Sequence, residues 1–315
     1  MSIDRVGTNS QAQVFLSQIM KANNSLTTSE MQVSSGKVSN TYGGYGDKTA
    51  LLEATRSAAN RATAYQQATS QALTQADMQD TQLTSLSDLA NQLRQAVTKA
   101  VATGDGSTLM TQAEGIYEQV TQILNSKDAS GNYLYGGDKN DTPPVTATTL
   151  AGLAALPSAS DAFVNGTVTS SVQVADGQSM QVGLLASDIG TQLMQTFQDI
   201  ANFNNGASGN FGQQLTSTQM DFLSGQIQSV TDAASGINNV AAQNGYAYSR
   251  LQDASDQQTS LNTLYTGFVS NLENVDMGQA VEQLNQNQVA LQAALQVTSN
   301  LNQISLLNYL PVSTG

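Results

Sequence analysis

The sequence predicts a mainly α protein, an elongated bundle of long antiparallel helices formed by its N- and C-terminal segments. A small β hairpin and a β-containing central insertion complete the predicted fold. First, the 315 residues contain four prolines and few aromatics, and Ala, Gln, Ser, Thr and Leu dominate, a composition typical of long helices. Second, apolar residues recur at alternating three- and four-residue steps near both ends. Third, the amino-acid composition changes at residues 141–186, which are rich in Thr, Ser, Gly and Val.

The N-terminal half shows helical periodicity interrupted by glycines. Residues 1–40 carry a coiled-coil seam whose members include Phe15, Ile19, Leu26 and Val33. A second helix is expected from residue 48 to about 103, and a third through residues 110–123. The stretch GNYLYGG, residues 131–137, places β-forming residues between glycines and predicts a hairpin or short strand. Residues 41–140 therefore form the first half of a helical body.

The stretch TYGGYGDKTALL, residues 41–52, predicts a hinge between the first two helices. Its members are Gly43, Gly44, Gly46 and Asp47, with Asp47 expected to cap a helix that begins at Lys48. A phosphate-binding loop is the alternative, but it requires Gly-Lys-Ser/Thr in immediate succession. Here Asp47 interrupts that spacing and puts a carboxylate where the anion would bind. We therefore interpret the stretch as a bend.

The central insertion, residues 141–186, is expected to contain β structure. VNGTVTSSVQV, residues 164–174, alternates like a pair of strands around an Asn-Gly turn. The weak hydrophobicity indicates an outward-facing module whose removal would leave the helical body intact.

The second half of the helical body, residues 187–275, contains a helix from about residue 188 and a much longer helix on a seam that includes Leu251. Arg250 is the only basic residue after Lys139. Its position beside Leu251 places it at the edge of a helix interface, with Glu53 as one possible partner. The alternative is a solvated cation of little consequence.

The C-terminal segment, residues 276–315, carries another coiled-coil seam, and no charged residue occurs from Gln283 onward. An uncharged helix is expected where protein surrounds it on most sides, as in a polymer; a poorly ordered polar tail is the alternative. The expected assembly interface combines both termini: Phe15, Ile19, Leu26, Val33, Leu284, Leu291, Leu295, Leu301, Ile304, Leu306, Leu307 and Leu310.

Composition excludes several classes of function. The net charge of −13 and the lack of a basic patch exclude nucleic-acid binding. With no Cys and no His, thiol catalysis, Ser-His-Asp triads, the usual zinc sites and His-ligated haem are excluded as well. We expect no cofactor, no metal, no membrane insertion and no enzymatic activity. A carboxylate-dependent enzyme is the less favoured alternative, but Glu114 and Glu118 are typical of a solvated helix face.

Four segments resemble the flagellin superfamily and, within it, the FlgL-type hook–filament junction proteins. They are QVSSGKVSN (32–40), NYLYGGDKNDTPPV (132–145), NGYAYSRLQDA (244–254) and SNLENVDMGQAVEQLNQNQVALQAALQ (270–296). The ending SLLNYL favours the junction proteins over flagellin, whose chains tend to stop at Leu-Leu. One departure occurs at TYGGYGDKTA, where the family usually has an acidic SPSDDP segment.

The resemblance implies a structural protein of the bacterial flagellum. Such proteins form a ring of identical subunits that joins the hook, through a FlgK-type hook-associated protein, to the flagellin filament. They are exported by the flagellar export apparatus without a cleaved signal peptide, and a cytoplasmic chaperone guards the C-terminus first. The expected location is therefore the extracellular flagellum. Flagellin itself, a filament subunit of the same fold, is the alternative.

Overall fold

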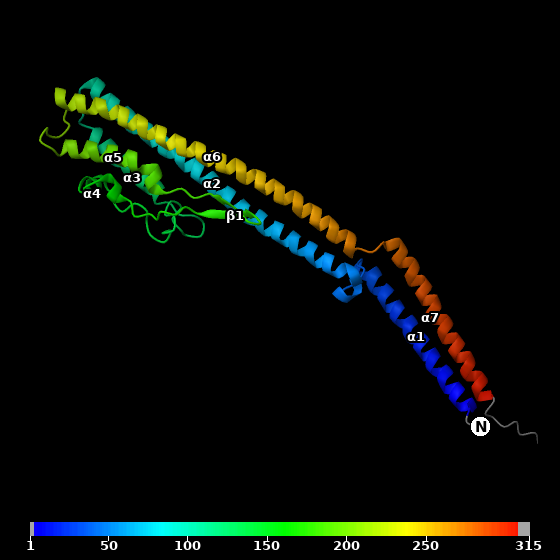
Figure 1. Ribbon diagram of the computed structural model, residues 1–315. Helices are drawn as coiled ribbons and strands as arrows, with labels where there is room; N and C mark the ends of the chain where they lie inside the picture. The colour runs from blue at the N-terminus through cyan, green and yellow to red at the C-terminus, as the bar shows by residue number, and fades with distance from the viewer. Residues whose placement is uncertain (1–2, 308–315) are drawn as a thin grey trace, which may run out of the picture. The chain divides into compact units, whose positions relative to one another are not determined.

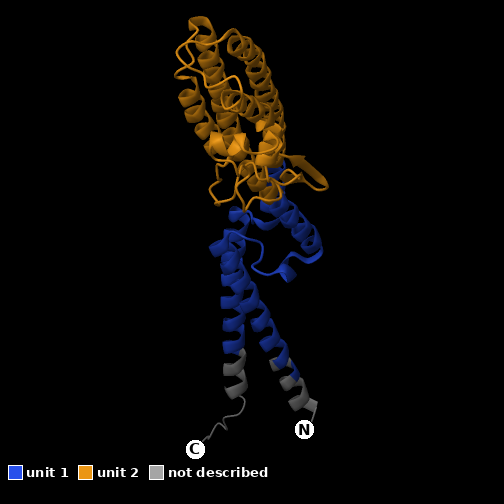
Figure 2. Cartoon of the chain, turned by 90° about the vertical axis from the view of Figure 1, so that its left-hand side faces the viewer, with its two compact units in different colours: residues 1–61, 261–315 blue, residues 62–260 orange. Residues whose placement is uncertain are grey.

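The computed structural model describes residues 3–307 and divides the chain into two compact units (Figures 1 and 2). Unit 1 contains residues 1–61 and 261–315, and unit 2 contains residues 62–260. Unit 1 thus brings together the two ends of the chain. No helix in the described part of the chain has the length and apolar character needed to cross a membrane.

Unit 1 is built from paired helices. Helix α1 (Ile3–Ser35) packs side by side with α7 (Met277–Leu307), as Figure 1 shows. The short 3-10 helix η1 (Tyr42–Lys48) leads into α2 (Thr49–Thr103), and α6 (Ser217–Glu273) ends just before α7. A polar contact crosses the α1–α7 pair, where Asn287 Nδ2 donates to Ser29 Oγ at 2.6 Å. The expected pairing of N- and C-terminal helices is confirmed.

Unit 2 holds the main apolar core. Helices α3 (Leu109–Leu124) and α5 (Ala186–Asn204) pack with the parts of α2 and α6 that belong to this unit. Fully buried side chains include Leu93 and Tyr117, whose ring meets Phe197 edge-on with centroids 5.3 Å apart. Each of these helices exposes polar residues on its other face, so one apolar stripe per helix accounts for the core.

The insertion contributes to this core, which corrects the expectation of an outward-facing module. Helix α4 (Leu150–Ala154) and the 3-10 helix η2 (Ala159–Ala162) pack against α5. Leu150 and Leu153 are buried in the same apolar cluster as the long helices. Tyr117 Oη also donates to the Ala147 carbonyl at 2.5 Å. A few apolar side chains among many Ser and Thr suffice to anchor the segment, which average hydrophobicity conceals.

The only strands in the described residues form one antiparallel hairpin, β1 (Ser171–Ala175) and β2 (Gln178–Gln181). Val172 pairs with Met180, and the turn lies at Asp176–Gly177. The Asn165–Gly166 turn expected from the sequence was wrong: Asn165 Nδ2 instead donates to Ser187 Oγ at 3.2 Å. GNYLYGG forms no strand pair of its own and joins Lys127 through a single bridge at Tyr133. The predicted mainly α fold with a small β hairpin is nevertheless confirmed.

Candidate functional site: the paired termini and the Glu273 cluster

The terminal helices bury one apolar stripe against each other, but only partly. The seam residues whose side chains are described as half-buried are Phe15, Ile19, Leu26, Val33, Leu284 and Leu291, whereas Leu295 is 51% exposed. Leu301, Ile304, Leu306 and Leu307 belong to α7, but their side chains lie outside the part that the structure describes, as does Leu310 altogether.

A second set of apolar side chains on these helices is exposed in the single chain. The exposed members are Val14, Leu16 and Met20 on α1, and Met277, Val281, Val289 and Val297 on α7. Met277, Val281 and Val297 stand at steps of the seam expected in the last helix, yet they are exposed. Val14, Leu16, Met20 and Val289 fall outside the seam, and a search for seam residues alone therefore misses these four. Scattered exposed apolar residues are ordinary, but rows of them on two neighbouring helices are typical of a surface that another chain covers.

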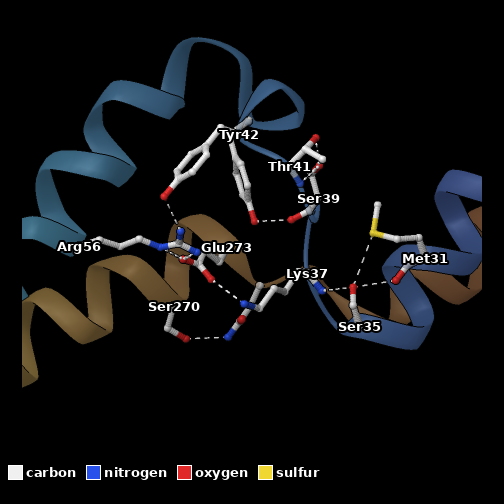
Figure 3. Close-up of polar contacts among 11 residues, drawn as sticks. Met31, Ser35, Lys37, Ser39, Thr41, Tyr42, Arg56, Ser270 and Glu273 are labelled. Atoms are coloured by element: carbon white, nitrogen blue, oxygen red, sulfur yellow. Dashed lines mark hydrogen bonds and ion pairs between the residues drawn. The ribbon is translucent and has the colours of Figure 1, made fainter.

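Where α1 ends and α7 begins, a buried carboxylate ties three chain segments together (Figure 3). Glu273, at the end of α6, accepts from Arg56 Nε at 2.5 Å and also pairs with Arg56 Nη2. Its other oxygen lies 3.1 Å from Lys37 Nζ, and Arg56 Nη1 donates to Tyr42 Oη at 3.1 Å. We call Lys37, Tyr42, Arg56 and Glu273 the Glu273 cluster. It joins the loop after α1 to α2 and α6.

Electrostatics favour the ionised form of Glu273. Its side chain is 7% exposed, and that burial raises the pKa of the carboxyl. Hydrogen bonds and charges from Lys37 and Arg56 outweigh burial, so the pKa of Glu273 lies below its ordinary value. The two cations are 45% and 35% exposed, and each keeps part of its hydration. The cluster is thus a semi-buried ion triad.

Main-chain hydrogen bonds hold the same loop against the end of α6. Val38 N donates to the Glu273 carbonyl at 2.7 Å, and Val275 N donates to the Gly36 carbonyl at 3.0 Å. The Asp276 carboxylate then accepts from Gly278 N at 2.8 Å, which caps the start of α7. Aspartate at this position and glycine after the last turn of α1 are the local signals that place both helix ends.

The expected hinge glycines act in different ways. Gly46 has φ +52°, a conformation that favours glycine, and Gly44 approaches Ser39 so closely that a Cβ would overlap its side chain. Gly43 has neither a positive φ nor a neighbour that a Cβ would overlap. Asp47 is exposed, and α2 begins at Thr49, whose hydroxyl donates to the Gly46 carbonyl at 2.8 Å. The cap expected from Asp47 at Lys48 is therefore not what the structure has.

The structure separates the two residues expected at a helix interface. Leu251 is fully buried in unit 2. Arg250 is exposed and forms no ion pair within the described residues, so the alternative of a solvated cation fits it better. An ion pair was expected at Arg250, whereas the ion pairs that form involve Glu273, a few residues before the last helix. The available signal in the sequence was Glu273 itself, because an acidic side chain is unusual at the C-terminal end of a helix.

The described residues offer little that catalysis would use. No group of three or more acidic, Cys or His side chains in this part of the chain is placed to hold a metal ion. Glu114 and Glu118, the carboxylates considered for an enzyme, are both exposed on α3. The arrangement that the structure does supply is apolar surface on paired helices, braced by the Glu273 cluster.

Comparisons with known proteins point the same way. Residues 227–310 match the model of the bacterial flagellin C-terminal helical region. A structure from Vibrio parahaemolyticus described as a flagellar hook-associated protein is similar at a TM-score of 0.57 and 16% identity, covering 72% of this chain and 97% of that one. FlgL of Bacillus cereus is similar at a TM-score of 0.52 and 13% identity, covering 69% and 98%.

Comparison with proteins of curated function gives no match. At these identities the two structures establish the fold, and the family model shows that the C-terminal helices are similar to those of flagellins. The resemblance stated from the sequence is confirmed: residues 227–310 match the flagellin C-terminal helical region, and the chain shares the fold of the FlgL-type structure.

Proposed function

We propose that this chain is a structural junction protein of the bacterial flagellum, in which a ring of identical subunits joins a FlgK-type hook-associated protein to the flagellin filament. The supporting observation is the α1–α7 pair, which carries apolar residues on its outer faces and no charge on α7 from Gln283 onward. The likeness to hook-associated structures over most of their length supports the same role.

The proposed assembly step follows from the burial of these helices. Each large apolar side chain removed from water contributes about 1.5–3 kcal/mol, but only when the covering surface already exists. Neighbouring subunits, the hook-side protein and flagellin would supply that surface. Such a role requires no catalytic site, and it places the chain in the extracellular flagellum after export of the unfolded protein, with a chaperone guarding the C-terminus beforehand.

Flagellin is the second candidate, favoured by the family model that matches residues 227–310. The two roles differ in where the protein ends up. Immunogold labelling of intact flagella should mark one narrow band at the end of the hook for a junction protein. Label along the whole filament would instead identify a flagellin.

Genetic removal provides the functional test. Without a junction protein, cells should keep hooks, lose filaments and release flagellin into the medium. Restoring the full chain should restore filaments, whereas a chain that lacks residues 290–315 should be exported without restoring them. Filaments that persist in the deletion strain would refute the junction role.

A further inference from the structure

A polar layer interrupts the apolar seam between α2 and α6 inside unit 2. It consists of Gln79 on α2, which has no exposed surface, and Asn244 on α6, which is 4% exposed. Asn244 Nδ2 donates to the Ala76 carbonyl at 2.8 Å. Neither amide atom of Gln79 has a hydrogen-bond partner among the described residues. A buried, unpaired amide is costly and rare, so its position calls for a physical explanation.

This layer lies where one apolar cluster ends and another begins. On α2, Ala72 and Ala76 belong to a small cluster, whereas Leu83 belongs to the main core. On α6, Leu251 and Ala254 belong to the small cluster, and Ile237 to the main core. In both helices the polar residue stands between the two sets. The buried residues of the main core and of the small cluster therefore form two separate apolar clusters, with the polar layer between them along both helices.

The small cluster is also the part that holds the β hairpin. Val174 and Val182, on and beside the two strands, are its only buried members from outside the long helices. Val172 and Met180, on the two strands, pack against this cluster while staying partly exposed. Polar contacts add to the attachment: Gln258 Nε2 donates to the Val174 carbonyl at 2.9 Å, and Tyr65 Oη donates to Asp176 Oδ1 at 2.6 Å. With alanines supplying half of its buried residues, the cluster has little apolar area to resist opening.

We propose that the Gln79–Asn244 layer divides unit 2 into two cooperative segments, so that the hairpin and its part of the α2–α6 pair open without the main core. The unpaired Gln79 amide gains hydrogen bonds with water when this segment opens, which lowers the free energy of opening. The main core, with Leu83, Tyr117 and Phe197 fully buried, stays closed. The inference does not depend on the proposed flagellar function.

Native-state hydrogen exchange of the full chain, followed by mass spectrometry at increasing urea below the unfolding transition, tests the proposal. Peptides from residues 171–181 and 248–258 should share one opening reaction, distinct in rate and urea dependence from that of residues 223–241. The variant Gln79→Met keeps the length of the side chain and removes the unpaired amide. It should slow exchange in the hairpin segment by roughly tenfold, toward the rate of the main core.

The matched control is Gln67→Met, the same replacement at an exposed position of α2, which should leave every rate unchanged. A single opening reaction for all of unit 2 in the wild-type chain would overturn the proposal. So would unchanged exchange in Gln79→Met, which would show that the unpaired amide does not lower the free energy of opening. Faster exchange, or failure of that variant to fold, would overturn it too, because the Gln79 amide would then stabilise the closed state.

Discussion

Neutralising Glu273 is expected to loosen the loop that follows α1. In Glu273→Gln the side chain keeps its size, but Arg56 and Lys37 lose the negative charge between them. Breaking a fully buried ion pair costs about 3–5 kcal/mol, and breaking an exposed one costs under about 1 kcal/mol. Because the carboxylate is buried while both cations are partly hydrated, we expect a loss of about 1–3 kcal/mol.

Hydrogen exchange of the amides in residues 36–48 measures this loss locally, and urea unfolding followed by circular dichroism measures it globally. The control is Glu53→Gln, which removes an exposed carboxylate from α2, one turn before Arg56. This variant should change the free energy of unfolding by under about 0.5 kcal/mol. Arg56→Met should cost more than Lys37→Met, because Arg56 contacts both Glu273 and Tyr42.

The pH dependence gives an independent readout. The pKa of Glu273 is lowered in the folded chain, so its stabilising effect is fully present above the unfolded value of 4.5 and disappears as the pH falls through the folded value. Glu273→Gln should lack this acid-induced step. Equal effects of Glu273→Gln and Glu53→Gln, or an unchanged acid step, would refute our account of the cluster.

Three further predictions follow from the packing. Leu153→Ala should destabilise unit 2 by about 2–5 kcal/mol in urea unfolding. Val168→Ala, at an exposed site of the same insertion, should have little effect. Equal effects of the two variants would show that the insertion does not contribute to the core. Burial raises the pKa of Tyr117 from 10.0 to about 12, so its contribution to stability should be lost as the pH rises from 10 through 12, and ultraviolet titration should show it ionising only with unfolding. Limited proteolysis of the monomer should trim both ends and leave a core near residues 45–275, since an isolated helix pair is marginal in water; ends as resistant as the middle would contradict this.

The helices could be predicted from the sequence because their signals are local. The steps of the apolar seam placed the long helices, and glycine-rich breaks placed their ends to within a residue or two: the expected start at Lys48 became Thr49. Each terminal helix carries an apolar stripe that it cannot bury alone. The two termini therefore pack against each other.

The polar contacts could not be predicted in this way, because they depend on which residues distant in sequence become neighbours. Arg56 meets Glu273 only after α2 and α6 have paired, and no local pattern specifies that register. The hairpin turn was misplaced for a related reason. Asn165–Gly166 has the stronger turn sequence, yet Asn165 bonds with Ser187 and leaves the turn to Asp176–Gly177. Tertiary contacts thus decided between two locally acceptable turns.

The paired terminal helices differ in charge and in apolar surface from one end to the other. A helix pair buries one stripe per helix, so rows of apolar residues on the outer faces, such as Leu16 and Val289, remain in water in the single chain. Charged residues would keep such a surface soluble and apart from other copies, and α7 lacks them beyond Glu282. The Glu273 cluster, in contrast, places buried charge at the other end of the same helices, where α1 and α7 meet the loop to α2. Charge therefore fixes the base of the pair within one chain, while the apolar residues on the rest of it stay exposed to water in the single chain. The role proposed above, a subunit ordered by assembly, would have neighbouring chains cover that surface.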